Sequence, residues 1–217
     1  MDTMAKELKL YFVRHGETQY NIEKRMQGSC NSPLTDKGIL QAKSVGAGLA
    51  DIPFVTAYAS DSQRVLDTAN YAIGDRDIAI NKDARLREMH FGILEEMLQE
   101  DILVKHGNIL ETFFSIADAE SKLEEGESYT ELLIRTKDAV KDIIEKHEST
   151  GGNILIFSHG ITIGYYMKNL LNRKDFPHHD NCCVSVVKYQ DGELTVEKLA
   201  DASFKERGSA LLSANNN

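Results

Sequence analysis

Two segments of the chain place a histidine beside residue types that bind phosphate. The first reads Arg14-His15-Gly16-Glu17-Thr18, and the second reads Ser158-His159-Gly160. A phosphoryl group in transfer spreads negative charge over its equatorial oxygens, so its pocket needs fixed cations and hydrogen-bond donors. A guanidinium can donate two hydrogen bonds to phosphate, and an imidazole kept neutral by nearby cations is a competent nucleophile. Arg14 and His15 therefore predict phosphoryl transfer through a phosphohistidine on His15.

A second arginine strengthens this prediction. Arg64 ends the run Ser60-Asp61-Ser62-Gln63-Arg64, early in a predicted helix. A lone arginine at such a place is usually a solvated helix face, and a lone Arg-His-Gly is equally consistent with a surface histidine. The Arg-His-Gly tripeptide does not stand alone, however, because Arg64 and the second histidine, His159, follow it in the chain.

Both histidines follow short apolar runs that are typical of buried strands. Residues 9–13 precede Arg14 and residues 154–157 precede Ser158. The carboxyl ends of such strands often carry the chemistry of α/β proteins. His159 also begins a predicted helix, whose first amide groups favour an anion. We therefore expect two strands to deliver the two His-Gly pairs.

Helical patterns alternate with strands elsewhere in the chain. Thr35 is expected to cap a helix with small and apolar residues at 42, 45, 46 and 49. Residues 54–59 predict a further strand, which leads into the helix that carries Arg64. Ser128 and Glu131 form a capping-box signature for the longest predicted helix.

The end of the chain shows a different pattern. The long helix is expected to reach about His147, where Gly151-Gly152 follows. Asp191-Gly192 lies between two strand-like runs and predicts a hairpin. The last ten or so residues, which finish with three asparagines, are expected to be frayed.

The length and the order of elements predict the architecture. A chain of 217 residues suits one well-buried domain, here 1–217. Alternating helices and strands with a closing hairpin predict an α/β fold, a three-layer αβα sandwich with a mixed, mainly parallel central sheet. Helical runs without strands, including one with Ile109, Phe113 and Ala117, predict a helical insertion at about 93–127 over the active site.

Composition excludes several classes of partner. The formal net charge is −9, whereas nonspecific nucleic-acid or membrane binding needs a basic face. Residues 1–7 carry charges and no apolar run, so neither a signal peptide nor a membrane helix is expected, and a cytoplasmic location is the default. We therefore expect a small-molecule partner, no nucleic acid and no membrane; the oligomeric state stays open.

Cysteine and histidine patterns do not predict a metal site. Cys30, Cys182 and Cys183 form no C-x-x-C pair, and we expect reduced thiols. His178 and His179 are adjacent, so their side chains project in different directions, and no ligand cluster accompanies them.

Several ordered motifs together resemble the histidine phosphatase superfamily, in its phosphoglycerate mutase-like branch. The resemblance spans nearly the whole chain and rests on the opening motif with Asn21, on Gln27-Gly28, Pro33-Leu34-Thr35, Arg64, Glu88, Gly126-Glu127-Ser128 and Ser158-His159-Gly160. Ordered motifs at family spacing are far more specific than any one of them.

The resemblance implies a role for each matching residue. His15 would be the phosphorylated nucleophile, and Arg14, Arg64 and His159, with Gly160, would complete the phosphate pocket. Asn21 and Gln27 would bind the same phosphate or the substrate. Glu88 would protonate the leaving oxygen and then activate water. Glu17 is a weaker candidate for carboxylate chemistry. The resemblance implies no metal and no organic cofactor.

The chain departs from the true mutases on the substrate side. Their Glu-Arg-His-Tyr-Gly stretch is replaced by Glu88-Met89-His90-Phe91-Gly92, and residues 92–128 are strongly acidic. The Gly-x-Trp-Glu-Gly pattern of the related phosphatases is also incomplete, because Gly92-Ile93-Leu94-Glu95-Glu96 lacks the tryptophan and the last glycine. We expect the acidic segment to repel a polyanionic substrate if it covers the pocket.

Three functions remain open at this point. The resemblance favours the broad-specificity phosphatases over the mutases, so we expect a histidine acid phosphatase-type enzyme that hydrolyses phosphomonoesters of a small soluble metabolite. The first alternative is a cofactor-dependent phosphoglycerate mutase. The second is a noncatalytic binding protein on the same fold, although all the expected catalytic groups are present.

Overall fold

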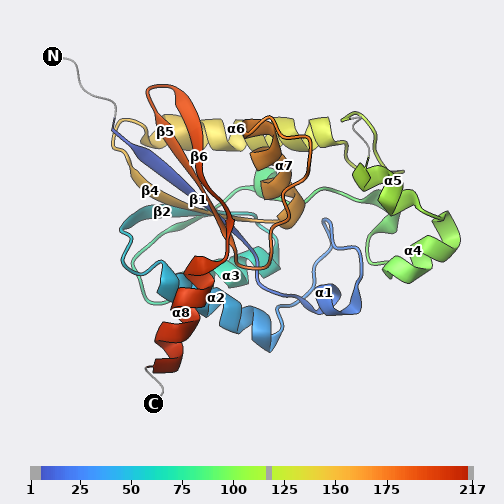
Figure 1. Cartoon of the computed structure of the whole chain (residues 1–217), viewed down its shortest axis with the longest axis horizontal. Coiled ribbons are helices and arrows are strands. Elements are labelled where there is room, and N and C mark those ends of the chain that lie inside the picture. The colour runs from blue at the N-terminus through green and yellow to red at the C-terminus, as the bar shows by residue number, and fades with distance from the viewer. Residues whose placement is uncertain (1–5, 116–118, 215–217) are drawn as a thin grey trace.

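The centre of the molecule is one mixed sheet of six strands (Figure 1). The computed structural model describes residues 6–115 and 119–214. Along the sheet the strand order is β3-β2-β4-β1-β5-β6. The four strands from β3 to β1 run parallel, and β5 and β6 continue the sheet antiparallel. The strands are β1 (Leu8–Arg14), β2 (Phe54–Ala59), β3 (Ile80–Lys82), β4 (Gly152–Ser158), β5 (Val184–Gln190) and β6 (Glu193–Asp201).

Helices cover both faces of this sheet, as the sequence predicts. The buried clusters place α6 and α7 on one face of the sheet and α2 and α3 on the other. In Figure 1, α6 lies above β2 and β4, and α2, α3 and α8 lie below them. The α-helices are α1 (Gln19–Glu23), α2 (Asp36–Gly48), α3 (Gln63–Ile73), α4 (Gln99–His106), α5 (Ile109–Ser115), α6 (Tyr129–His147), α7 (Gly160–Leu170) and α8 (Ser203–Ala214).

Alternation along the strands divides the apolar side chains between two cores. In β1, Leu10 and Phe12 pack with α6 and α7, whereas Tyr11 and Val13 pack with α2 and α3. The same alternation occurs in β4, where Ile156 and Phe157 belong to opposite cores. A strand buried on both faces needs such a continuous apolar run. The predicted three-layer αβα sandwich with a mixed sheet is confirmed.

Parallel pairing brings three strand ends to one edge of the sheet. In the register, Arg14 pairs with Ser158 and Ala59 pairs with Phe157. The residues that follow these strands, His15, His159 and Ser60, therefore meet at the same place. The strand register therefore places the two predicted His-Gly pairs next to each other.

The region between 92 and 128 is only partly helical. It contains α4, α5 and the 3-10 turn Gly92–Leu94, whereas residues 119–127 form no helix. It stands at one side of the molecule (Figure 1) and is joined to the segment after α1, since Met26 N donates to Met97 O at 3.0 Å. Ala117, expected on its second helix, lies outside the described residues, as do residues 1–5 of the expected charged amino terminus.

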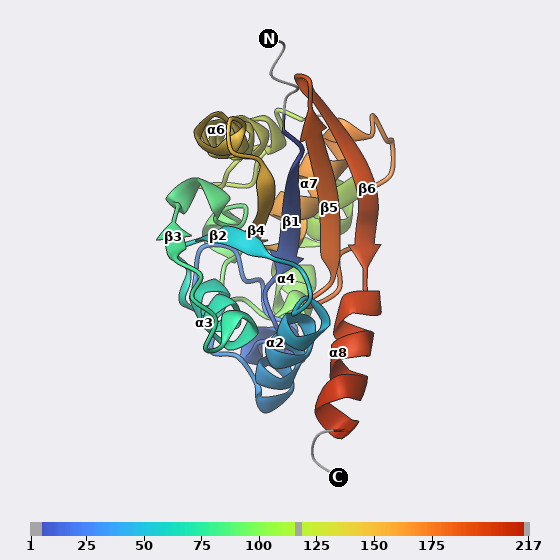
Figure 2. The ribbon, with the colours of Figure 1, turned by 90° about the vertical axis from the view of Figure 1, so that its left-hand side faces the viewer.

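The expectation of a frayed carboxyl terminus is wrong for residues up to 214. Ser203–Ala214 form α8, which packs along α2 (Figure 2), while residues 215–217 lie outside the description. The two helices approach closely through glycine: a Cβ on Gly208 would lie 1.7 Å from Ser44 O, and one on Gly48 would lie 1.8 Å from Phe204 O. This contact, which composition alone does not reveal, holds the helix in place.

Across residues 6–115 and 119–214, no helix is both long and apolar enough to cross a membrane.

Gly208→Ala tests the contact between α2 and α8. Alanine favours a helix by about 1 kcal/mol over glycine, but here its Cβ would collide with α2 backbone. We expect the collision to prevail and to lower the free energy of unfolding by about 1–3 kcal/mol, measured by urea denaturation. Ser209→Ala, at an exposed position on the same helix, should change stability little. A more stable Gly208→Ala protein would contradict this packing.

Candidate active site

His15 stands at the carboxyl end of β1 with one ring nitrogen already engaged. Its Nδ1 lies 2.8 Å from the carbonyl oxygen of Gly16. Because a carbonyl can only accept, Nδ1 carries the proton and Nε2 keeps a free lone pair. The backbone of His15 is held on both sides, since its amide donates to Ser158 O and its carbonyl accepts from Asn181 Nδ2. This arrangement prepares Nε2 as a nucleophile.

The surroundings of His15 keep the imidazole neutral. Burial lowers its pKa well below the ordinary value of 6.5, and the charges of Arg64 and Arg14 lower it further. Burial likewise lowers the pKa of His159 well below that value, with Arg64 as the next cause. The two rings lie with their centroids 5.4 Å apart, edge to face. A neutral nucleophile beside fixed cations is the state that attack on a phosphate requires.

Arg14 is oriented by the loop between α7 and β5. Its Nη1 donates to the carbonyl of His179, and its Nε is buried without a partner among the described residues. Burial lowers the pKa of Arg14, while the carboxylate of Glu88 acts in the opposite direction. The ring of His179 is fixed in turn by Ser185 Oγ, 2.8 Å from its Nε2.

Arg64, on α3, is almost completely buried. Its Nη1 donates to Cys30 O at 2.7 Å, and its Nη2 donates to Gly28 O at 2.8 Å and to His159 Nδ1 at 2.9 Å. His159 must therefore carry its proton on Nε2, which donates to Ser60 Oγ at 2.9 Å. Burial lowers the pKa of Arg64 to about 10, so it stays charged at neutral pH.

Glu88 is held by the first turn of α7. Its Oε1 accepts from the amides of Thr162 and Met89, each at 3.0 Å. The Thr162 hydroxyl has one proton to share between this oxygen, at 2.9 Å, and the carbonyl of Arg87, at 2.8 Å. Oε2 accepts from Ile161 N alone, at 3.0 Å. Oε2 is therefore the less engaged oxygen, and we expect it to transfer the proton.

The remaining predicted residues lie around the same cavity. Gln27 Oε1 accepts from Thr18 Oγ1, while its Nε2 is buried without a partner among the described residues. Asn21 completes the cap of α1 together with Thr18. Gly160 begins α7 and lies against the guanidinium of Arg14. Glu17 instead pairs with Lys37 and Thr35, away from the cavity lining.

The cavity has a volume of about 310 Å³. Six predicted residues line it: Arg14, His15, Asn21, Gln27, Glu88 and Gly160. Arg64 and His159 are not among the lining residues; the ring of His159 packs on that of His15, and Arg64 bonds to His159. The Nε of Arg64 has no partner among the described residues, and its Nη1 uses one of its two N–H groups on Cys30 O. Their direct contact with a phosphate therefore stays a prediction.

Aromatic side chains also line the cavity. The rings of Phe91, Phe114 and Phe176 take part, and Gln99 adds an amide. Of the described residues in the region 92–128, Gln99 and Phe114 belong to this lining and none of the carboxylates does. Arg25 is a basic residue of the lining, and it is paired with Glu23 at 2.6 Å.

The sequence predicts repulsion of a polyanion if the acidic segment covers the pocket. Among residues 92–115 and 119–128, no carboxylate lines the cavity. Glu95, for example, accepts instead from the amides of Ser29 and Cys30. Glu95 therefore helps to hold the loop at residues 28–30, to which Arg64 also donates hydrogen bonds. Met89 is fully buried in an apolar cluster with Met26 and Leu94, and it does not face the cavity.

Several residues of the site were not singled out from the sequence. Ser60, Thr162 and Asn181 bond to the predicted groups, but isolated polar residues give no signal of such roles. Arg135 and Glu127 support the Glu88 segment, and only the motif Gly126-Glu127-Ser128 pointed toward them.

Within the described part of the chain, no three His, Cys, Asp or Glu residues are grouped to hold a metal ion. His178 is exposed and pairs with Asp180, while His179 is buried on Ser185. All three cysteines are free thiols.

Comparison with known proteins identifies the family. Residues 10–202 match the histidine phosphatase superfamily (branch 1), so the chain belongs to that superfamily. "Probable phosphoglycerate mutase GpmB" from Enterobacter sp. (strain 638) is 32% identical over 188 residues, which cover 85% of this chain and 86% of the relative.

Solved structures give the same result. Bacillus stearothermophilus YhfR superposes with a TM-score of 0.86 at 30% identity, covering 91% of this chain and 99% of its own. A phosphoglycerate mutase from Bacillus anthracis str. Sterne has a TM-score of 0.80 at 30% identity, covering 96% and 99%. An α-ribazole phosphatase from Shigella flexneri has a TM-score of 0.77 at 25% identity, covering 89% and 96%. Both mutases and phosphatases are thus among the similar proteins.

The neutral state of His15 predicts a dependence of stability on pH. Its native pKa lies below the ordinary 6.5, so the unfolded chain binds the proton first as the pH falls. Stability from this residue is present above that pH and is lost below it, at up to about 1.4 kcal/mol per pH unit. We expect His15→Gln to flatten the decline of the unfolding free energy below pH 6.5, measured by urea denaturation. Identical slopes for both proteins would contradict a neutral, buried His15.

Proposed function

We propose that this member of the histidine phosphatase superfamily hydrolyses phosphomonoesters of small soluble metabolites through a phosphohistidine on His15. One observation carries the proposal: the Nδ1 proton of His15 is held by Gly16 O, which leaves Nε2 free beside Arg14 in a cavity that Glu88 also lines. In one place the arrangement supplies a nucleophile, cationic donors and a carboxyl group.

The first step transfers the phosphoryl group to the protein. His15 Nε2 attacks phosphorus, the N–P bond forms, and the bond from phosphorus to the ester oxygen breaks. The carboxyl group of Glu88, protonated for this step, gives its proton to the departing alkoxide. Arg14 and the amide of Gln27 offer donors to the equatorial oxygens, where charge accumulates.

The second step returns the enzyme to its starting state. Glu88, now a carboxylate, takes a proton from water while the water oxygen attacks phosphorus. The new O–P bond forms as the N–P bond breaks, which regenerates neutral His15 and releases inorganic phosphate. Protons and charges balance over the two steps with only water as co-reactant.

The aromatic side chains in the cavity lining support hydrolysis over mutase action. A mutase must retain the dephosphorylated intermediate until it takes the phosphoryl group back. A three-carbon acid has little apolar surface, so its retention needs charge-assisted hydrogen bonds of roughly 1.5–3 kcal/mol each. Phe91, Phe114 and Phe176 offer none. Without two such bonds, residence shortens by about two to four powers of ten, and water wins.

The mutase alternative is supported by two observations. Two of the similar proteins are named as phosphoglycerate mutases. Arg25 lines the cavity, and a carboxylate could compete there with Glu23 for its guanidinium.

A single assay separates hydrolysis from isomerisation. The enzyme is mixed with 3-phosphoglycerate, with and without catalytic 2,3-bisphosphoglycerate, and 2-phosphoglycerate and free phosphate are followed together. We expect phosphate release to exceed isomerisation under both conditions, with faster release from esters of apolar alcohols. His15→Ala is the control for contaminating activity. Isomerisation much faster than phosphate release would replace the proposal with the mutase alternative.

A further inference from the structure

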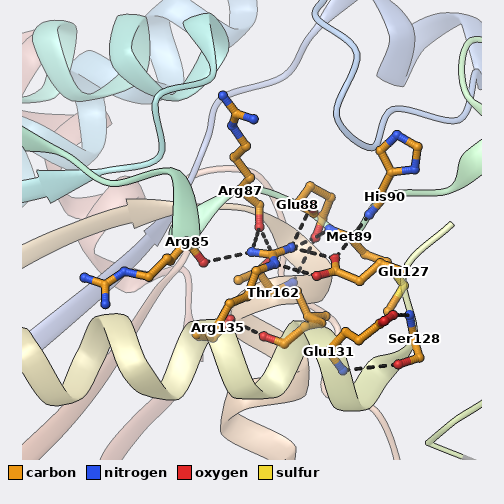
Figure 3. Close-up of polar contacts among 12 residues, drawn as sticks. Arg85, Arg87, Glu88, Met89, His90, Glu127, Ser128, Glu131, Arg135 and Thr162 are labelled. Atoms are coloured by element: carbon orange, nitrogen blue, oxygen red, sulfur yellow. Dashed lines mark hydrogen bonds and ion pairs between the residues drawn. The ribbon is translucent and has the colours of Figure 1, made fainter.

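The segment that carries Glu88 is held by one arginine of the longest helix. Arg135 lies on α6, and its guanidinium faces the chain at residues 85–88 (Figure 3). Its Nε and Nη2 donate to the two carboxylate oxygens of Glu127 at 2.6 and 2.8 Å. The side chains of both partners are mostly shielded, at 21% and 15% exposure. This two-point pairing fixes the plane of the guanidinium.

The other donors of Arg135 bind backbone carbonyls. Nη1 donates to Arg85 O at 2.8 Å and to Arg87 O at 2.7 Å, and Nη2 donates to Glu88 O at 2.9 Å (Figure 3). A guanidinium has five N–H donors, and all five are used here. Residues 87–91 belong to no helix or strand, so the carbonyls of Arg87 and Glu88 have no partner from regular secondary structure. Arg135 supplies donors to both of them, and Thr162 Oγ1 also lies 2.8 Å from Arg87 O.

Glu88 is thus held from two directions. Arg135 fixes the backbone at its carbonyl, and Thr162 with Ile161 on α7 fixes its carboxylate. A proton-transfer group must stay within hydrogen-bond reach of the reacting oxygen, and small misplacements cost rate. The position of the Glu88 backbone limits where its carboxylate can reach, because the side chain rotates about bonds that start at this backbone.

We propose that Arg135 is a positioning residue for Glu88, and that Glu127 orients Arg135 for this role. The inference rests on the proposed function, in which Glu88 is the proton donor. A lysine could not replace Arg135, since an ammonium group has three donors on a flexible stem and cannot present the planar fork. Arg135 itself stays away from the reacting atoms and acts through the position of Glu88.

The test compares two substrates that differ in their need for a proton. p-Nitrophenyl phosphate has a leaving group that departs without protonation, whereas glycerol 2-phosphate releases an alkoxide. We expect Glu88→Gln to lower kcat/KM for glycerol 2-phosphate by about 10²–10⁴-fold, with a much smaller loss on p-nitrophenyl phosphate. Arg135→Met should shift the ratio of the two rates in the same direction by about tenfold or more.

A double variant distinguishes positioning from general support. If Arg135 acts through Glu88, adding Arg135→Met to Glu88→Gln should leave the rate on glycerol 2-phosphate nearly unchanged. Arg76→Met is the matched control: Arg76 also donates to backbone carbonyls, those of Ala72 and Ile73, but at the end of α3 and outside the cavity lining. The control should leave the ratio of the two rates unchanged even if the protein melts earlier.

Other outcomes overturn the inference. Equal losses on both substrates in Arg135→Met, or a full additional loss in the double variant, would make Arg135 a structural brace only. If Glu88→Gln does not discriminate between the substrates, the assignment of the acid in the proposed function fails, and the inference fails with it. Circular dichroism checks that each variant folds. Should Arg135→Met not fold, Glu127→Gln takes its place, and equal losses on both substrates there would likewise reject the role.

Discussion

Burial of the Arg64 guanidinium is the constraint on which most of the site depends. A charged group that is 1% exposed must find its hydrogen bonds inside the protein, since an unpaired buried charge costs several kcal/mol. Arg64 finds them on the carbonyls of Gly28 and Cys30 and on His159 Nδ1. The first two contacts fix the loop that carries Gln27, and the third fixes the tautomer of His159. The same positive charge helps to keep His15 neutral.

The lining of the cavity combines two kinds of group. The ends of three parallel strands and the start of α7 hold the groups proposed for phosphoryl transfer. Aromatic rings from three separate segments add apolar surface, together with Arg25 in its pair with Glu23. The first set of groups can stabilise a transferring phosphoryl group, and the aromatic rings can receive an apolar leaving group. A polar acid is poorly retained by such rings, which is why water is expected to take the phosphoryl group from His15.

Much of this arrangement follows from local patterns in the sequence. The buried strands ending at Arg14 and Ser158 were predictable, because a four- or five-residue apolar run followed by polar residues specifies both strand and strand end. The helix α8 was not predictable, since it depends on the close contact of Gly208 with α2. The supporting roles of Glu95 and Arg135 were not predictable from local patterns either. Glu95 bonds to backbone amides 65 and 66 residues away, and Arg135 bonds to backbone carbonyls 47 to 50 residues away. Such partners come together only when the chain folds.

We propose that His15 Nε2 carries the phosphoryl group between ester and water. The most direct test is to mix the protein with a ³²P-labelled phosphomonoester, stop the reaction within milliseconds in alkali, where phosphohistidine survives, and map the label by digestion and mass spectrometry. We expect label on His15 that decays as phosphate is released, and no label in His15→Ala. Label on another residue, or full turnover by His15→Ala, would contradict it.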